Sequence, residues 1–264
     1  MMNILDFYAK KKNGEKISVI TCYDYTSARI LAQTAVDCLL VGDSVAMTMH
    51  GFKDTLSATL EMMCFHTAAV ARGAGKKFII SDLPFLSYRK SISKNVSAAQ
   101  VLMQAGACAV KLERAAGNEK LIRHFSESGI PVVGHIGLTP QFIHALGGYK
   151  PQGITADSAQ QLQEDALRLQ QAGCFAIVLE CIPIKLAKKI TSSLIIPTIG
   201  IGAGPFTDGQ VLVFQDLLGL NVDFQPKFVK TFLDGQKKIQ DSVETYIQEI
   251  QSGAFPQHEH CYHD

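Results

Sequence analysis

The chain has 264 residues, with 25 Lys and Arg against 24 Asp and Glu, which gives a formal net charge of +1. This near balance argues against binding to nucleic acid or to a membrane surface, because proteins that bind them usually carry a marked basic excess. Hydrophobic residues make up 47% of the chain and charged residues 19%. Such a chain is rich enough in core-forming residues to fold as a compact globule.

The sequence gives no sign of a membrane or secreted protein. The longest apolar stretch, residues 192–207, is interrupted by prolines and glycines, so it does not read as a bilayer-spanning helix. The N-terminus lacks a basic segment followed by an apolar one. The seven cysteines include no CxxC pair, and most lie in or beside apolar runs, where Cys acts as a small hydrophobe. We therefore expect a cytoplasmic protein without a zinc or dithiol centre.

Short apolar runs alternate with helix-like polar segments along the chain. The runs are residues 17–23, 38–41, 78–80, 109–112, 131–133, 176–179, 195–201 and 211–214. Most are uniformly apolar, which is typical of parallel strands covered by helices on both faces. Spaced apolar positions predict helices over residues 58–71, 96–104, 156–171, 184–191 and 236–251. Gly73, Gly106 and Gly173 stand where C-terminal helix caps are expected.

Eight alternating units in a chain of this length predict a (β/α)8 barrel, with a doubly wound open sheet as the rival. We expect one barrel domain over residues 1–264, with a short N-terminal extension and a C-terminal helix. An internal echo favours the barrel: residues 104–113 align without gaps with residues 171–180, and both read Gln-Ala-Gly followed by an apolar run ending in Leu-Glu. The offset of 67 residues corresponds to two strand-and-helix units.

Polar residues cluster where the predicted strands end, and in a parallel barrel these ends meet at one rim. Side chains alternate along a strand, so Lys111 and Glu113 share the face of Ala109, which we expect to point into the barrel. The same count places Asp43, Asp82 and Glu180 on the faces of Val41, Ile80 and Val178. Four carboxylates and a single lysine would then share one opening.

Crowded carboxylates raise one another's pKa unless a cation is present. The oxygen-rich ligand set favours Mg²⁺, which binds one or two protein carboxylates and completes its shell with water and substrate. We expect Asp43 and Asp82, at neighbouring strand ends, to be the ligands. A glutamate is then left to act as a base.

Structural interpretations of the same residues stay open. Asp24, Asp43 or Asp82 would each serve equally as the N-cap of a following helix. Lys111 and Glu113 would form a structural ion pair, and His135 a hydrogen-bonded rim histidine without a catalytic role. The long connections 46–56 and 138–153 lack periodicity of their own, which is typical of lids or binding segments.

Several motifs, taken together and in order, resemble the ketopantoate hydroxymethyltransferase family. They are Val-Gly-Asp-Ser at 41–44, Ser-Asp-Leu-Pro-Phe at 81–85, Val-Lys-Leu-Glu at 110–113, Gly-His-Ile-Gly-Leu-Thr-Pro-Gln at 134–141, Val-Leu-Glu-Cys-Ile-Pro at 178–183, Ile-Gly-Ile-Gly-Ala-Gly at 199–204 and Asp-Gly-Gln-Val-Leu-Val at 208–213. The resemblance covers residues 23–230, most of the chain.

The resemblance implies transfer of the one-carbon unit of 5,10-methylenetetrahydrofolate to 3-methyl-2-oxobutanoate, giving 2-dehydropantoate through a Mg²⁺-stabilised enolate. This is the first step of pantothenate biosynthesis. The family also implies a homodecamer.

The resemblance also implies roles for individual residues. Asp43 and Asp82 would bind Mg²⁺, with Glu113 at or just outside its coordination shell. Ser44 and Lys111 would hold the substrate, and Asp43, Asp82 and the nearby His135 also count among the substrate-binding residues. Glu180 would accept the proton.

The sequence departs from the family pattern in two loops, with Arg114 where Gly is expected and Val-Ala-Met at 45–47 where Leu-Gly-Met is expected. Two other functions stay open. One is a different Mg²⁺-dependent enolate barrel enzyme, a lyase or mutase of the phosphoenolpyruvate or pyruvate type. The other is a binding or assembly protein on the same barrel.

Overall fold

The computed structural model describes residues 2–221 and 226–262. The chain divides into two compact units, residues 1–213 and residues 214–264. All eight strands belong to the first unit. No helix within the described ranges is long and apolar enough to cross a membrane.

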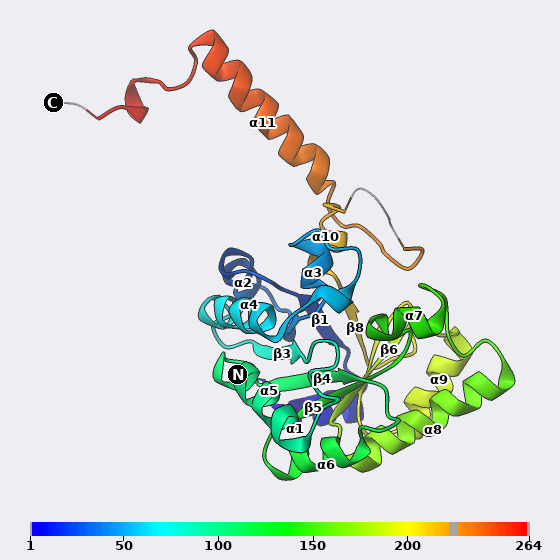
Figure 1. The fold of residues 1–264 in the computed structure, drawn as a ribbon. Helices are drawn as coiled ribbons and strands as arrows, with labels where there is room; N and C mark the ends of the chain where they lie inside the picture. The colour runs from blue at the N-terminus through cyan, green and yellow to red at the C-terminus, as the bar shows by residue number, and fades with distance from the viewer. Residues whose placement is uncertain (1, 222–225, 263–264) are drawn as a thin grey trace. The chain divides into compact units, whose positions relative to one another are not determined.

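The first unit is a closed parallel barrel in which the eight strands follow one another in chain order (Figure 1). The strands are β1 (Ile17–Thr21), β2 (Cys38–Val41), β3 (Phe78–Asp82), β4 (Ala109–Glu113), β5 (Val132–Gly137), β6 (Ala176–Glu180), β7 (Thr198–Ile201) and β8 (Gly209–Leu212). Parallel pairing of β1 with β8 closes the ring, with Val19 opposite Val211. The predicted (β/α)8 barrel is confirmed, and the open sheet is excluded.

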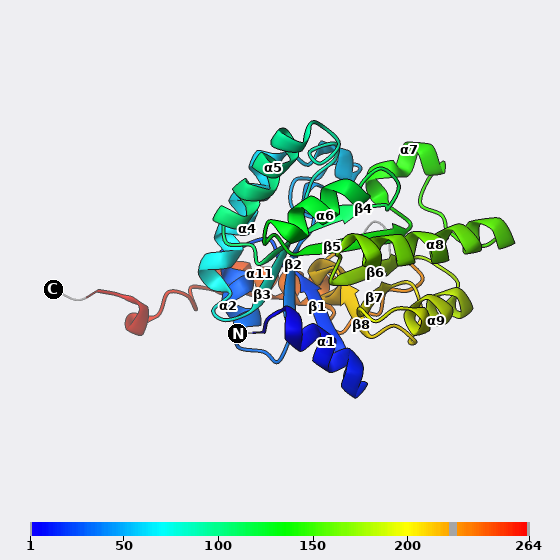
Figure 2. The same cartoon turned by 90° about the horizontal axis from the view of Figure 1, so that it is seen from below.

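Helices surround the strands on the outside of the barrel (Figure 2). The first unit holds α1 (Ile4–Asn13), α2 (Tyr25–Ala32), α3 (Val45–Thr48), α4 (Leu60–Gly73), α5 (Ile92–Gln104), α6 (Glu119–Glu127), α7 (Ile143–Leu146), α8 (Ala156–Ala172) and α9 (Ile184–Ser193), with 3-10 turns at Thr55–Ser57 and Pro140–Phe142. The second unit holds α10 (Phe214–Leu217), α11 (Gly235–Ser252) and a 3-10 turn at His258–His260.

The five predicted helices correspond to α4, α5, α8, α9 and α11, and the sequence does not predict the other helices, of which α1, α2 and α6 are the longest. Asp24 is the N-cap of α2, since its Oδ1 accepts a hydrogen bond of 2.8 Å from the backbone N–H of Ser27. The N-cap interpretation therefore holds for Asp24. It does not hold for Asp82, which lies far from the start of α5 at Ile92. It does not hold for Asp43 either, because α3 begins without a side-chain cap.

Two of the three predicted glycine caps lie at helix ends. Gly173 caps α8 with a φ of 112°, and Gly106, also at 112°, follows the last turn of α5. The prediction is wrong for Gly73, which is the last residue of α4 and not its cap. A side chain there would place Cβ 2.6 Å from the carbonyl oxygen of Tyr25. The close packing of α4 on α2 therefore leaves no room for a side chain at this position.

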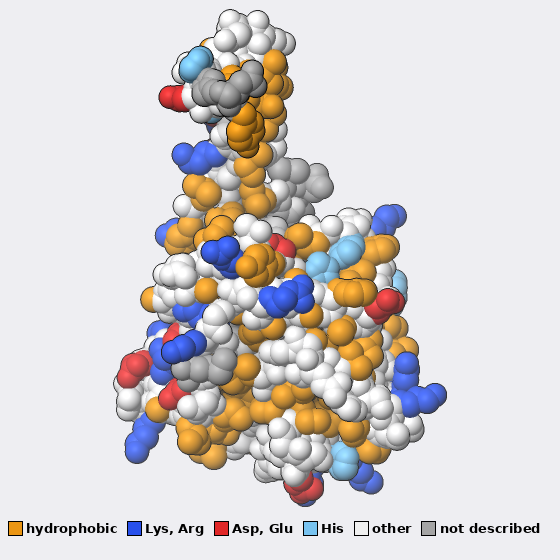
Figure 3. All heavy atoms as spheres, turned by 90° about the vertical axis from the view of Figure 1, so that its left-hand side faces the viewer, with side chains coloured by type: hydrophobic (Ala, Val, Ile, Leu, Met, Phe, Trp, Pro, Cys, Tyr) orange, Lys and Arg blue, Asp and Glu red, His pale blue; other side chains and the backbone are white. Residues whose placement is uncertain are grey.

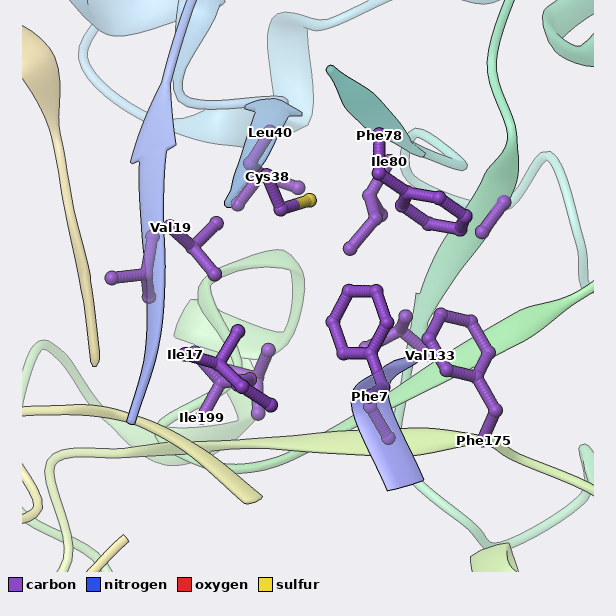
Figure 4. Packing of buried hydrophobic residues seen from close by; sticks show 14 residues of the cluster. Phe7, Ile17, Val19, Cys38, Leu40, Phe78, Ile80, Val133, Phe175 and Ile199 are labelled. Atoms are coloured by element: carbon purple, nitrogen blue, oxygen red, sulfur yellow. The ribbon is translucent and has the colours of Figure 1, made fainter. Parts of the chain in front are cut away.

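An aromatic plug fills the barrel at the amino ends of the strands (Figure 4). Phe7 of α1 is fully buried, and its ring centroid lies 5.2 Å from those of Phe78 and Phe175 in edge-to-face arrangements. Phe78 begins β3, and Phe175 directly precedes β6. Each such aromatic pair contributes about 0.5–1.5 kcal/mol beyond area burial. Helix α1, expected only as an extension, thus closes one end of the barrel.

Candidate active site at the carboxyl ends of the strands

The opposite end of the barrel, here called the mouth, is formed by the carboxyl ends of the strands and holds the charged residues. Each of four charged side chains stands two positions beyond an apolar residue of the barrel interior. The pairs are Ile80 and Asp82, Ala109 and Lys111, Val133 and His135, and Val178 and Glu180. The predicted alternation is therefore correct for β3, β4 and β6. The same side of β5 brings in His135.

Asp43 reaches the mouth by a different route from the one predicted. Cys38 and Leu40 belong to the interior cluster of the barrel, and Val41 does not. The inference that Asp43 shares an inward face with Val41 is therefore wrong. The strand ends at Val41, and the chain turns at Gly42, where a Cβ would lie 2.9 Å from the Ser44 hydroxyl oxygen. This turn carries Asp43 beside β3.

Asp43, Asp82 and Lys111 form a buried charged group. The backbone N–H of Asp43 donates to Asp82 Oδ2 at 3.0 Å, and Lys111 Nζ lies 3.0 Å from the same oxygen. Burial, together with the neighbouring charge of Asp82, raises the pKa of Asp43 well above its usual range. Burial acts to lower the pKa of Lys111, but the surrounding carboxylates, Asp82 first, outweigh it and raise that pKa. The ion pair of Lys111 is thus with Asp82, and not with Glu113.

His135 bridges the two glutamates of the mouth. Its Nδ1 lies 3.4 Å from Glu113 Oε1, and its Nε2 lies 3.0 Å from Glu180 Oε2. Burial and Lys111 act to lower the pKa of His135, but Glu113 and Glu180 raise it to about 9. At neutral pH the imidazole is therefore positively charged between two carboxylates. Strand β6, which carries Glu180, stands opposite β2 in the ring of eight.

Two residues that the sequence did not single out complete the mouth. Gln141 donates from Nε2 to Asp43 Oδ2 at 2.8 Å, and Tyr88 donates from its hydroxyl to Gln141 Oε1 at 2.8 Å. Both side chains are buried. Gln141 is the last residue of the motif at 134–141, so the sequence marks its position. Its partners lie far away in the sequence, so the motif does not indicate its contacts.

Ser44 is held from the side of β1. Its hydroxyl lies 2.7 Å from the Tyr23 hydroxyl. Burial raises the pKa of Tyr23 to about 12, although the hydrogen bond to Ser44 opposes this. Tyr23 therefore stays protonated, and it fixes the Ser44 side chain beside Asp43.

The two long connections are less irregular than predicted. Residues 46–56 include most of α3 and the start of a 3-10 turn, and residues 138–153 include a 3-10 turn and α7. The Tyr149 hydroxyl lies 3.9 Å from Met47 Sδ, so the two connections touch. His50 Nε2 lies 2.9 Å from His66 Nε2, which ties the first connection to α4. Both connections follow strands that end at the mouth.

The donor set of the mouth fits a hard cation that brings its own additional ligands. Within the described part of the chain, no three His, Cys, Asp or Glu side chains form a metal site by themselves. Asp82 Oδ1 and Glu113 Oε1 are buried oxygen atoms without a hydrogen-bond partner. One or two carboxylate oxygens, with water and substrate filling the other positions, match the coordination of Mg²⁺.

A closed (β/α)8 barrel with buried acids, a lysine and a histidine at the carboxyl ends of its strands defines the class of barrel enzymes. The chain matches the ketopantoate hydroxymethyltransferase family over residues 1–258. It belongs to that family and is a transferase.

The relatives agree with this assignment. The 3-methyl-2-oxobutanoate hydroxymethyltransferase of Francisella tularensis subsp. novicida is 55% identical over 99% of both chains. The enzyme of the same name from Bdellovibrio bacteriovorus is 56% identical over 99% of this chain and 100% of its own.

Solved structures show the same fold at much lower identity. A phosphonopyruvate hydrolase in complex with oxalate and Mg²⁺ has a TM-score of 0.64 at 11% identity, covering 98% of this chain and 93% of its own. A 2,3-dimethylmalate lyase of the PEP mutase/isocitrate lyase superfamily has a TM-score of 0.61 at 14% identity, covering 99% and 93%. At these identities the likeness concerns the fold alone.

Proposed function

We propose that the chain transfers the one-carbon unit of 5,10-methylenetetrahydrofolate to 3-methyl-2-oxobutanoate, giving 2-dehydropantoate and tetrahydrofolate. A proton leaves C3 of the oxo acid, a C–C bond forms to the folate-borne carbon, its C–N bonds break, and water supplies the new hydroxyl oxygen. The observation that carries the proposal is the division of the mouth. An acid pair with Lys111 stands at β2 to β4, and Glu180 stands on the opposite strand.

Asp43 and Asp82 would hold Mg²⁺, with Glu113 at or just outside its coordination shell. When bound there, Mg²⁺ would act as a Lewis acid that polarises the keto group of a 2-oxo acid and stabilises negative charge on its oxygen. Lys111 and Ser44 would bind the carboxylate and oxo groups of the substrate. Lys111 Nζ has three donors, and its contact with Asp82 at 3.0 Å keeps it at the centre of the mouth.

Glu180 would remove the C3 proton. Its side chain is 16% exposed, whereas that of Glu113 is 1% exposed. Glu180 is therefore the glutamate with an open path to substrate, and it is held by His135 at 3.0 Å. A carboxylate positioned in this way contributes about 10²–10⁴-fold as a general base. The connections 46–56 and 138–153 would hold the folate close to the enolate carbon.

The test is a turnover assay with 3-methyl-2-oxobutanoate, Mg²⁺ and 5,10-methylenetetrahydrofolate, in which each component is omitted in turn. The proposal expects 2-dehydropantoate only when all three are present. Product formed without the folate would contradict the co-substrate. Cleavage of a C–C bond in an oxo acid without folate would instead indicate a lyase of the phosphoenolpyruvate or pyruvate type.

We also propose that the chain forms a homo-oligomer, a decamer by family resemblance. Helix α11 of the second unit supports this, because its apolar side chains are about half exposed (Figure 3). They are Ile239, Val243, Tyr246 and Ile250. A stripe of this kind is typical of an interaction surface. Light scattering coupled to size exclusion should give about ten times the chain mass of 28.7 kDa, and a monomer mass would contradict the proposal.

A further inference from the structure

Gln141 is buried among the acids of the mouth, with 3% of its surface exposed, and it makes four hydrogen bonds there. Its Nε2 donates to Asp43 Oδ2 at 2.8 Å and to the Leu83 carbonyl at 2.9 Å. Its backbone N–H donates to Glu113 Oε2 at 3.1 Å, and its Oε1 accepts from the Tyr88 hydroxyl at 2.8 Å. One residue thus holds two of the three buried acids Asp43, Asp82 and Glu113.

The contacts fix which way the amide of Gln141 points. Both hydrogens of Nε2 go to acceptors, the Leu83 carbonyl and Asp43 Oδ2, and neither the carbonyl nor the ionised carboxylate that would bind a cation could bond an amide oxygen. The Tyr88 hydroxyl donates to Gln141 and also accepts from the backbone N–H of Glu113 at 3.3 Å. A flipped amide would set Oε1 against two acceptors, so Gln141 always presents a donor to Asp43.

Each acid of the group has one oxygen already engaged by the protein. Gln141 engages Asp43 Oδ2 and Glu113 Oε2, and Lys111 engages Asp82 Oδ2. The remaining oxygens include Asp82 Oδ1 and Glu113 Oε1, which are buried without a hydrogen bond. Glu113 Oε1 also faces His135 Nδ1 at 3.4 Å, so Asp82 Oδ1 is the clearest free oxygen for a cation.

We propose that Gln141 is a positioning and specificity-determining residue that makes Asp43 a one-oxygen ligand and so favours Mg²⁺ over Ca²⁺. Mg²⁺ takes six ligands in a tight octahedron, whereas Ca²⁺ takes six to eight and often binds both oxygens of one carboxylate. The amide hydrogen bond to Asp43 Oδ2 uses one of the lone pairs of that oxygen and orients the carboxylate, which disfavours the two-oxygen mode. The inference rests on the proposed metal position and adds its selectivity.

The variant Gln141→Met tests this directly, because it removes the amide at similar length and keeps the backbone N–H that donates to Glu113. Binding of Mg²⁺ and of Ca²⁺ is measured separately by titration calorimetry on the full chain. We expect the ratio of the Ca²⁺ Kd to the Mg²⁺ Kd to fall by about 10-fold or more, the scale of outer-shell effects on metal affinity. A matched control is Gln170→Met, which removes an amide that bonds the backbone N–H of Ile195 at 2.7 Å, away from the mouth.

The outcomes separate this inference from the proposed function. An unchanged Kd ratio in folded Gln141→Met, or a ratio that changes equally in Gln170→Met, overturns the role of Gln141 and leaves the metal position standing. Absence of Mg²⁺ binding by the unmodified chain overturns both. Tyr88→Phe provides a second test should Gln141→Met not fold, because it removes only the hydroxyl that orients the amide. It should shift the ratio in the same direction by a smaller factor.

Discussion

The two ends of the barrel are built from the same eight strands but differ in what they bury. At the amino ends, Phe7, Phe78 and Phe175 pack edge to face with no charged group among them. At the mouth, Lys111 and Glu113 are 5% and 1% exposed. Burial of unpaired charge is costly, and Lys111 and His135 offset part of that cost by pairing with Asp82, Glu113 and Glu180. One end supplies stability and the other supplies chemistry.

The backbone shows the same contrast. Among the described residues, the non-glycine residues with positive φ are Leu86, Arg114 and Cys181, at 57°, 68° and 47°. Arg114 directly follows Glu113, and Cys181 directly follows Glu180. A left-handed conformation costs a non-glycine residue about 1–2 kcal/mol, and such strain gathers at functional sites. Two of the three strained positions thus lie beside the glutamates of the mouth.

The largest effect on stability is expected from Phe7→Ala. Loss of a buried phenylalanine should lower the free energy of unfolding by about 3–5 kcal/mol, while the Mg²⁺ Kd of the folded protein stays unchanged. Denaturant unfolding with and without Mg²⁺ measures both. Phe65→Ala is the control, because Phe65 is 68% exposed, and its effect should stay within about 0.5 kcal/mol. A Phe7→Ala protein as stable as the unmodified chain would contradict the role of α1 as a plug.

A smaller effect, with a different response to metal, is expected from Lys111→Met. Removing the partner of Asp82 leaves buried carboxylates uncompensated, which should cost about 3 kcal/mol without metal. Saturating Mg²⁺ should recover part of this loss, because it supplies positive charge to the same oxygens. Lys11→Met, which breaks the ion pair with Asp208 outside the mouth, should show no such recovery. If Mg²⁺ restored both variants equally, or neither, the contrast between the two ends would fail.

Most of the fold could be predicted from the sequence because it depends on local patterns. All eight apolar runs became strands, and the echo between residues 104–113 and 171–180 falls on β4 and β6, two units apart. Helix α6 was missed although Leu121, Ile122 and Phe125 form its buried face. Its N-cap residue, Asn118, is of a type that favours capping, but its side chain makes no capping bond and instead donates to the carbonyls of Glu113 and Arg114.

The contacts of the mouth could be predicted only in part. Period-two alternation placed Asp82, Lys111, Glu113 and Glu180 correctly, since it is a property of one strand. The link from Gln141 to Asp43 joins residues 98 positions apart and depends on how three loops pack. The plug of Phe7 is likewise a long-range contact. No local pattern specifies either one.

The central claim is that Glu180 removes the C3 proton while the acids on the opposite side of the mouth bind the metal. Its most direct test is solvent deuterium uptake at C3 of 3-methyl-2-oxobutanoate, measured with Mg²⁺ by the unmodified chain and by Glu180→Gln. The account predicts that the variant loses uptake by about 10²–10⁴-fold and keeps its Mg²⁺ Kd. Undiminished uptake in a folded, Mg²⁺-binding Glu180→Gln protein would contradict it.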